Sequence, residues 1–529
     1  MEIALKSELP TYCGGLGVLA GDYVRSSADL GIPLIGVTLV SKEGYFCQDI
    51  NENGQQIESP EPYDPSKYMD SLPENVDVQI QGRNVKVKAW CYKYTSPHAS
   101  EGVIPILFLD TDVHGNQQED RKITSVLYGG DQRYRLKQEI VLGIGGIRML
   151  HALGFNAQRY HMNEGHSGLL GLELLQKFAM DEQQVKQRCV FTTHTPVKAA
   201  HDKFPYDLVQ EIMGNVIPLE KLKKLGGQDK LNMTQLALNL SQHCNGVSNK
   251  HREITAQLFP NHKIRAITNG VHSYTWTHPR FRELYDSYIL GWANEPELLA
   301  RTENIPDEEI WRAHVAAKKE LIDYVNKNTD IDMQQNVLTL GFARRATAYK
   351  RANFLFSDLQ RLRDIAKKYE LQIIFSGKSH QNNLQGKQLI QELFTYMHEL
   401  RNVIKIVYLK NYNIEQAAKL VSGTDVWLNT PLPPFEASGT SGMKAAHNGV
   451  LNFSVLDGWW IEGCLEGVTG WAIGPHPNIS YTEEERKIRE MEDLYAKLMY
   501  IIAPMYYKRR SHWIEMMKKS IAKIAYYFN

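Results

Sequence analysis

Short runs of apolar residues alternate along the chain with longer segments of helical spacing. In the first half, continuous apolar runs predict buried strands at residues 32–40, 103–110, 190–193 and 264–268. Between them, apolar positions recur with the helical period, as at 134–153 and 168–178. Strands that alternate with helices predict parallel sheets covered on both faces, so the pattern indicates an α/β fold.

The second half repeats the pattern more clearly. Apolar runs flanked by turn residues predict strands at 337–342, 371–376, 403–409, 425–429 and 450–456. The segment after the first run places five side chains on one helical face, namely Leu355, Leu359, Leu362, Ala366 and Tyr369. Two such series predict two doubly wound, Rossmann-like lobes, residues 1–270 and 271–529, facing a central cleft. Ligands bind open α/β sheets at the carboxyl ends of the strands, so we expect the active site in that cleft.

Predicted helices lie before and after the second series of strands. A long helix is predicted over 307–324, ahead of the first strand. The tail opens with a capping box, Thr482-Glu483-Glu484-Glu485, and continues helically with a predicted break at Pro504.

Composition and charge narrow the classes of function. Hydrophobic residues make up 43% of the 529 residues, which is ample for a packed interior. Lys+Arg and Asp+Glu both number 60, so no basic excess is available to neutralise a nucleic acid backbone. We therefore expect no nucleic acid partner, whereas a neutral polysaccharide fits this balance.

The cysteines indicate a reducing compartment. Six are scattered along the chain without a CxxC pair, which favours free thiols over a disulfide frame or a zinc site: Cys13, Cys47, Cys91, Cys189, Cys244 and Cys464. We expect no signal peptide, because charges near the amino terminus stand where a signal peptide needs an apolar core, and no apolar run approaches the ~20 residues of a membrane helix. The sequence predicts a cytoplasmic protein with no metal ion and no membrane partner.

The first of two glycine-rich segments is Tyr12-Cys13-Gly14-Gly15-Leu16-Gly17, which precedes a helical segment. Backbone N–H groups freed by successive glycines can converge on an anion at a helix start. A tight turn with close packing is an equally good interpretation. Neither this loop nor Gly377-Lys378-Ser379 completes a P-loop, so nucleotide binding is poorly supported.

The second segment follows a predicted strand and enters a short helix. It reads Glu436-Ala437-Ser438-Gly439-Thr440-Ser441-Gly442-Met443-Lys444. The N–H groups of Gly439, Thr440 and Ser441 suit a phosphate. An amine beside such a loop is what pyridoxal phosphate requires, although a lysine in a first helical turn is more often simply solvated.

This second segment closely resembles the cofactor segment of glycogen and α-glucan phosphorylases. Further blocks follow in the family's order along nearly the whole chain: Gly14-Gly15-Leu16-Gly17, Asn163-Glu164-Gly165-His166, Thr193-His194-Thr195-Pro196, Thr268-Asn269-Gly270-Val271, Arg344-Arg345, Tyr349-Lys350-Arg351, Ser376-Gly377-Lys378 and Asn411-Tyr412. The resemblance is closest to the compact prokaryotic-type branch, as in Asp457-Gly458-Trp459-Trp460. It implies a GT-B fold and retaining phosphorolysis of terminal α-1,4-linked glucose from glycogen or maltodextrin by orthophosphate, giving α-D-glucose 1-phosphate.

The resemblance also implies roles for residues around a cofactor and a phosphate. Lys444 would hold pyridoxal 5′-phosphate covalently. The cofactor phosphate would be bound by Arg344, Lys350 and the segment Gly439, Thr440 and Ser441, with Tyr412 close by. Arg345 would bind orthophosphate through its forked donors, assisted by Lys350 and the amides of Gly14 and Gly15.

Other residues would bind the glucan. His194 would lie near the glucosyl ring, although a histidine after a strand is more often structural. The sugar hydroxyls would contact Asn269, Glu436, Ser438 and Gly439, and Leu16 and Glu2 would lie at the glycine loop. Asp131 matches a substrate-side loop only loosely, and a plain turn is as good an interpretation.

Two alternatives stay open. A cofactor-free glycosyltransferase that uses a sugar nucleotide, as glycogen and starch synthases do, would carry a carboxylate where this chain has Lys444. An inactive glucan-binding protein is the other, because family members commonly extend beyond both ends of this chain and lost ends could abolish turnover. Family members are commonly dimers or larger, so a homo-oligomer is within the expectation.

Overall fold

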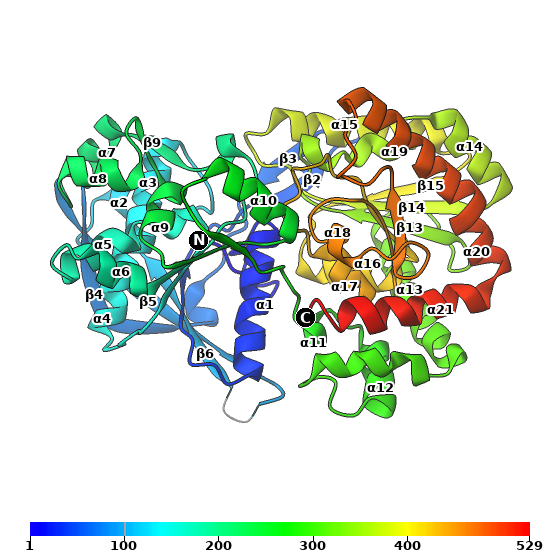
Figure 1. The fold of residues 1–529 in the computed structure, drawn as a ribbon, viewed down its shortest axis with the longest axis horizontal. Coiled ribbons are helices and arrows are strands. Elements are labelled where there is room, and N and C mark those ends of the chain that lie inside the picture. The colour runs from blue at the N-terminus through cyan, green and yellow to red at the C-terminus, as the bar shows by residue number, and fades with distance from the viewer. Residues whose placement is uncertain (100–101) are drawn as a thin grey trace. The chain divides into compact units, whose positions relative to one another are not determined.

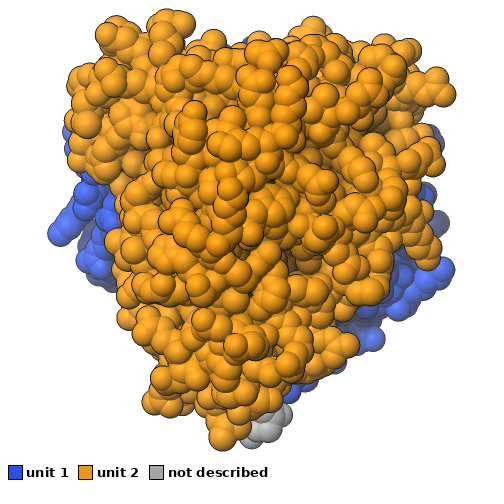
Figure 2. Space-filling model, turned by 90° about the vertical axis from the view of Figure 1, so that its right-hand side faces the viewer, with its two compact units in different colours: residues 1–46, 60–268 blue, residues 47–59, 269–529 orange. Residues whose placement is uncertain are grey.

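The computed structural model describes residues 1–99 and 102–529 (Figure 1). The chain forms two compact units, which Figure 2 distinguishes by colour. Unit 1 comprises residues 1–46 and 60–268, and unit 2 comprises residues 47–59 and 269–529. The predicted first lobe included residues 47–59, Asn269 and Gly270, whereas the structure assigns all of these to unit 2.

The first sheet of unit 1 is mixed, with the strand order β1-β6-β5-β4. β1 pairs in parallel with β6, and antiparallel pairs join β6 to β5 and β5 to β4. The strands are β1 (Gly36–Leu39), β4 (Asp70–Ile80), β5 (Arg83–Thr95) and β6 (Val103–Asp110). The expectation of parallel pairing alone is wrong here. β5 alternates buried Val85 and Val87 with exposed Lys86, so this half-exposed hairpin lacks the continuous apolar run of a buried strand.

The second sheet of unit 1 is parallel throughout, with the order β12-β11-β8-β7. Its strands are β7 (Tyr160–Asn163), β8 (Cys189–Thr192), β11 (His243–Gly246) and β12 (Ile264–Ala266). A two-stranded ribbon joins β9 (Lys203–Pro205) to β10 (Lys230–Asn232). The helices are α1 (Gly15–Asp29), α2 (Gln118–Arg121), α3 (Gln132–Ile140), α4 (Gly146–Ala152), α5 (Leu170–Lys177), α6 (Glu182–Arg188), α7 (Tyr206–Met213), α8 (Leu219–Gly226), α9 (Met233–Asn239) and α10 (Asn249–Leu258).

Unit 2 is built on a six-stranded parallel sheet with the order β15-β14-β13-β16-β17-β18. The strands are β13 (Leu338–Ala343), β14 (Leu371–Ser376), β15 (Lys405–Leu409), β16 (Val426–Asn429), β17 (Leu451–Val455) and β18 (Gly470–Ile473). Every residue of β13, β14, β16 and β17 is buried, which explains their continuous apolar runs and confirms these predicted strands. The chain order along the sheet reverses between β13 and β16, as in a doubly wound fold.

Helices surround this sheet in unit 2 (Figure 1). They are α11 (Ser273–Trp276), α12 (Pro279–Tyr288), α13 (Asp307–Asn328), α14 (Leu359–Lys368), α15 (Leu384–Leu400), α16 (Ile414–Gly423), α17 (Ser441–Ala446), α18 (Trp460–Gly463), α19 (Glu483–Lys497), α20 (Ala503–Lys508) and α21 (Arg510–Ser520). The capping box at Thr482 is confirmed. A π-helical stretch, Leu498–Ile502, interrupts the α-helical pattern just before Pro504, which lies in the first turn of α20. The chain stays helical through this stretch and turns at Arg509.

A short antiparallel hairpin, β2 (Cys47–Ile50) and β3 (Gln56–Ser59), also belongs to unit 2. Ile50 is part of the hydrophobic core of that unit. Across the described residues, none of the helices combines the length and the apolar character that a membrane span needs.

Candidate functional site

Several predicted site residues of unit 2 lie in the loops that follow its parallel strands. Arg344 and Arg345 come after β13, Tyr412 lies three residues beyond β15, and Glu436 lies in the loop that follows β16. Asp457 follows β17. Because the order of the sheet reverses between β13 and β16, the loops after these two strands border the position where doubly wound sheets bind ligands.

A charged cluster joins these two loops. The Oε2 atom of Glu436 lies 2.5 Å from both Arg344 Nη2 and Lys350 Nζ, and the Glu436 side chain is buried. Burial alone would raise the pKa of Glu436, but the two cations outweigh it and hold this pKa at about 2. Glu436 is therefore ionised at physiological pH, and the three side chains together retain one net positive charge.

Asp457 shapes the loop that carries Glu436. Its carboxylate accepts hydrogen bonds from the N–H groups of Glu436 (2.8 Å) and Gly458 (3.0 Å), and the Trp459 N–H donates to Ser438 O (3.0 Å). Burial, together with the nearby Glu436 carboxylate, raises the pKa of Asp457 to about 7. In the sequence Asp457 is recognisable only as part of a family block, because its role depends on a contact with a loop 21 residues away.

Lys444 lies on α17, where only 6% of the residue is exposed. Its Nζ atom lies 4.1 Å from the centre of the Trp276 ring. Asn448 fixes the backbone on both sides of this contact, since its side-chain amide donates to Trp276 O (2.8 Å) and Lys444 O (3.1 Å). The structure therefore excludes the interpretation of Lys444 as a solvated surface lysine. A buried amine against an aromatic wall suits covalent chemistry with a carbonyl.

Hydrogen-bond donors near the charged cluster are available for an anion. Among the described residues, Arg344 Nη1 and Thr347 Oγ1 are buried and have no hydrogen-bond partner. Unpaired buried donors are costly, and a phosphate group would satisfy them. Gly439 lies against Glu436 and has φ +79°, a conformation that glycine adopts without strain. These observations fit a phosphorylated cofactor held at the strand ends.

In unit 1, Glu2 lies at the glycine loop. Gly14 caps α1, and the Glu2 carboxylate accepts hydrogen bonds from the N–H groups of Cys13 (2.7 Å) and Gly14 (3.2 Å). The Tyr128 hydroxyl donates to the other Glu2 oxygen (3.2 Å). The Gly14 N–H that the resemblance assigned to orthophosphate therefore binds Glu2 in this structure. Gly15 and Leu16 follow in the first turn of α1.

His194 belongs to a partly buried hydrogen-bond network at the ends of β7 and β8. Its Nε2 atom lies 2.6 Å from Asn163 Oδ1, and its backbone N–H donates to Glu164 Oε2 (2.7 Å). Glu164 also accepts a hydrogen bond from the Thr195 hydroxyl (2.9 Å). Burial lowers the pKa of His194 to about 3, so the ring is neutral at physiological pH. The family blocks contain these residues, but their spacing did not reveal the network.

Two further predicted substrate residues, Asp131 and Asn269, lie outside the networks described above. Asp131 is the N-cap of α3, where its side chain accepts a hydrogen bond from the Tyr134 N–H (2.9 Å). This is the turn-like role that the sequence left open. Asn269 is half-buried, and the nearby Val271 N–H donates to Phe528 O (3.0 Å) within unit 2.

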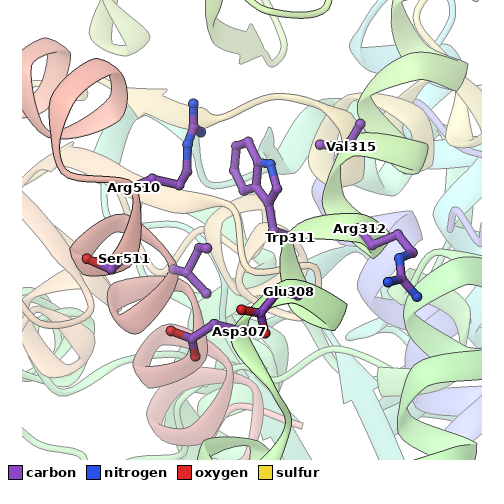
Figure 3. Close-up of a pocket in the computed structure, with 8 residues that line it drawn as sticks. Asp307, Glu308, Trp311, Arg312, Val315, Arg510 and Ser511 are labelled. Carbon is purple, nitrogen blue, oxygen red and sulfur yellow. The ribbon is translucent and has the colours of Figure 1, made fainter.

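A separate pocket of about 620 Å³ lies in unit 2 between α13 and α21 (Figure 3). None of the predicted site residues lines it. Arg510 stacks on the Trp311 ring, with Cζ 3.8 Å from the ring centre, and Asp307 pairs with Lys518 at 2.9 Å. The predicted site residues of unit 2 lie in the strand-end loops and in α17, away from this pocket.

Comparison with known proteins identifies the family. A family model described as carbohydrate phosphorylase matches residues 204–469. The chain is 39% identical to a maltodextrin phosphorylase of Thermococcus litoralis, over 99% of this chain and 68% of the relative. The chain belongs to the carbohydrate phosphorylase family. This phosphorylase is also 34% identical to a glycogen phosphorylase of Aquifex aeolicus (99% and 82% covered) and 35% identical to one of Mycobacterium tuberculosis (98% and 67%).

A second family model, described as starch synthase catalytic domain, matches residues 12–269 of this phosphorylase. That match covers most of unit 1 and excludes Lys444. The predicted family and the predicted α/β class with parallel sheets are both confirmed, and this architecture is consistent with the GT-B fold.

Proposed function

We propose that this phosphorylase transfers the terminal α-1,4-linked glucose of a glucan to orthophosphate with retention, giving α-D-glucose 1-phosphate. The observation that carries the proposal is the buried amine of Lys444 on the loop–helix segment that also supplies Glu436 to the Arg344–Lys350 cluster. The relatives named maltodextrin and glycogen phosphorylase support this activity.

The cofactor of the proposal is pyridoxal 5′-phosphate. Lys444 would hold it covalently, and its phosphate would be bound by Arg344, Lys350 and the amides of Gly439, Thr440 and Ser441, with Tyr412 close by. The unpartnered Arg344 Nη1 and Thr347 Oγ1 support this placement. In phosphorylases the bound cofactor supplies a phosphate group for acid–base chemistry.

The other residues would bind and orient the substrates. Arg345 is exposed beside the cluster, where its forked guanidinium can bind orthophosphate from solvent, with Lys350 assisting. Glu436 stays ionised and can accept hydrogen bonds from sugar hydroxyls, beside Ser438 and Gly439. Orthophosphate protonates the glycosidic oxygen as the C1–O bond breaks, and its oxygen then bonds to C1 on the same face. The substrate roles of Gly14, Gly15, Leu16, Glu2, His194, Asp131 and Asn269 stay predictions from the resemblance.

The experiment is an assay for glucose 1-phosphate released from maltoheptaose and orthophosphate, with pyridoxal phosphate quantified in the same samples. Lys444→Ala is compared with Lys367→Ala, a surface lysine of the same unit. We expect product and stoichiometric cofactor in the native protein and in Lys367→Ala, and neither in Lys444→Ala. Cofactor without product in the native protein would instead indicate an inactive glucan-binding protein.

The starch synthase match favours a second candidate, a glycosyltransferase that uses a sugar nucleotide. The same preparations are therefore assayed for glucosyl transfer from nucleoside diphosphate glucose to maltoheptaose. Transfer in this arm, with no cofactor and no glucose 1-phosphate after reconstitution, would replace the phosphorylase proposal.

The proposed location is the cytoplasm, since all six cysteines have free thiols. A homo-oligomer is proposed from the family resemblance, and light scattering on the purified protein tests it.

A further inference from the structure

The β2–β3 hairpin places two buried glutamine side chains against the loops that follow β14 and β15. Gln48 is 3% exposed and Gln56 is 8% exposed. Gln48 Nε2 donates to Gly377 O (2.9 Å) and to Gln56 Oε1 (2.8 Å). Gln48 Oε1 accepts from the Asn411 N–H (2.9 Å), and the Gln48 N–H donates to Asn411 Oδ1 (3.1 Å). One side chain thus binds both loops.

Gln56 makes a matching set of contacts. Its Nε2 atom donates to Ser379 O (2.8 Å) and to Glu58 Oε1 (2.6 Å), and its Oε1 accepts from the Ser379 N–H (2.9 Å). Both side-chain amides therefore use their full donor capacity. Because any other arrangement would leave a buried polar group unpaired, this network fixes the position of the loop backbone.

The loop after β14 is bonded in turn to the arginine loop after β13. The N–H groups of Arg344 and Ala346 donate to carbonyl oxygens of Ser376 (3.1 Å) and Lys378 (3.0 Å). Arg345 lies between these two backbone hydrogen bonds. The two loops also approach closely, since a Cβ atom on Gly377 would clash with a backbone oxygen of the arginine loop. A shift of residues 377–379 must therefore move the backbone that carries Arg345.

We propose that Gln48 and Gln56 are positioning residues that set the place of Arg345 and thereby the affinity for orthophosphate. The inference rests on the proposed function, in which Arg345 binds that substrate. The glutamines act through the backbone of residues 377–379. A bidentate contact between guanidinium and phosphate depends on geometry, so a displaced backbone weakens it even though every charge remains.

The test uses isosteric substitutions in the full-length protein. Gln48→Glu and Gln56→Glu keep the side-chain volume but place a carboxylate oxygen against the carbonyl oxygen of Gly377 or Ser379. Gln55→Glu is the matched control, because it adds the same charge at an exposed position of the same hairpin. We expect KM for orthophosphate to rise about 10-fold in the two variants, with kcat and the KM for maltoheptaose changed less than about 2-fold. Gln55→Glu should match the native protein.

The pH dependence separates positioning from general damage. In Gln48→Glu, protonation of the introduced carboxylate would restore a donor toward Gly377 O. The KM ratio of this variant to the native protein should therefore shrink from about pH 8 to about pH 6. A ratio that is constant with pH, or an unchanged KM in both variants, would overturn the proposal. If Gln48→Glu does not fold, Gln56→Met removes the hydrogen bonds without adding charge and carries the KM test.

Hydrogen exchange gives a readout that does not depend on activity. Peptides covering residues 377–379 and 411–412 should exchange faster in Gln48→Glu than in Gln55→Glu. Faster exchange with an unchanged KM would refute the link to phosphate. If the native protein releases no glucose 1-phosphate, the proposed function fails, whereas the exchange experiment still decides whether the glutamines hold these loops.

Discussion

Asp457 and Gly458 together define the backbone of the loop that carries Glu436. Asp457 accepts the Glu436 N–H, and Gly458 adopts φ +54° directly beside Ser438. A Cβ atom on Gly458 would clash with the Ser438 carbonyl oxygen. Two neighbouring residues thus hold the loop that would bind the sugar and the cofactor.

We expect Gly458→Ala to destabilise unit 2 by about 3 kcal/mol, because the strained φ adds to a clash with backbone that cannot move alone. Gly467→Ala is the control. Gly467 has φ +70° but nothing within 4 Å of an added Cβ, so only the conformational cost of about 1 kcal/mol applies. Urea unfolding followed by tryptophan fluorescence measures both variants. Equal losses would show that the Ser438 contact yields easily.

The raised pKa of Asp457 makes the stability of unit 2 depend on pH. The pKa of Asp457 is raised from 3.8 to about 7 in the folded protein. A raised carboxyl pKa favours the fold fully below the unfolded value, and this contribution is lost as pH rises through about 7. In Asp457→Asn the contribution is absent. The stability of the native protein relative to this variant should therefore fall by up to about 4 kcal/mol from about pH 4 to about pH 7. Parallel urea titrations test this, and a pH-independent difference would contradict it.

Site residues could be predicted from the sequence only where their chemistry and their place in a family block are both evident. Lys444 and Glu436 meet this condition, because they lie in one continuous block that resembles the cofactor segment of the family. Asp457 and Gln48 were not assigned roles, because a hydrogen bond to a distant backbone N–H or carbonyl leaves no periodic trace. Asp131 caps α3 in the structure, and its substrate role stays a prediction from a loose match.

At the scale of elements, a buried ion pair joins α13 to Asp425, the residue just before β16. Lys318 Nζ lies 2.5 Å from Asp425 Oδ2, and His314 Nε2 lies 2.9 Å from Oδ1. Burial alone would raise the pKa of Asp425, but Lys318 and His314 lower it, so the carboxylate stays charged. This pair fixes the position of the longest helix against the sheet that carries the site.

We expect Asp425→Ala to cost about 3–5 kcal/mol, because it leaves the Lys318 ammonium buried without its counter-charge. The control lies on the same helix. Lys319 and Asp323 form an exposed pair at 2.5 Å, and Asp323→Ala should cost no more than about 0.5 kcal/mol. Denaturant unfolding of the two variants gives the comparison. A loss in Asp425→Ala as small as in Asp323→Ala would show that the buried pair is energetically neutral.

The elements themselves were predictable to different degrees. β13 to β17 were predicted because strands buried on both faces are continuously apolar. β4, β5 and the β2–β3 hairpin were not, since they alternate polar and apolar side chains, and two inward positions of the hairpin are glutamines. Glutamine is a polar residue that usually lies at the surface, so the sequence does not distinguish a buried one. Only its hydrogen-bond partners in the structure identify it as internal.

At the scale of the whole molecule, the hairpin makes unit 2 discontinuous in sequence. Cys47 pairs with Ser59, so a short Gly-Gly link could replace residues 47–59 without stretching the chain. We expect this deletion to remove Ile50 from the core of unit 2 and to accelerate hydrogen exchange at 377–379 and in β15. Exchange in β7 and β8 of unit 1 should be unchanged. Glu52→Ala, at the exposed tip, is the control, and unchanged exchange in unit 2 after the deletion would contradict the expectation.

The chain passes between the two units after residues 46, 59 and 268, and this connectivity restricts how the gene could be recombined. A single crossover at 268/269 between two family members would join the second half of one parent to a hairpin inherited from the other. Gln48 and Gln56 would then come from one parent and the loops after β14 and β15 from the other, so their hydrogen bonds could be lost. Chimeras that transfer residues 47–59 together with 269–529 should be the ones that keep native stability, and breakpoints tolerated in libraries of hybrids would reveal the same grouping.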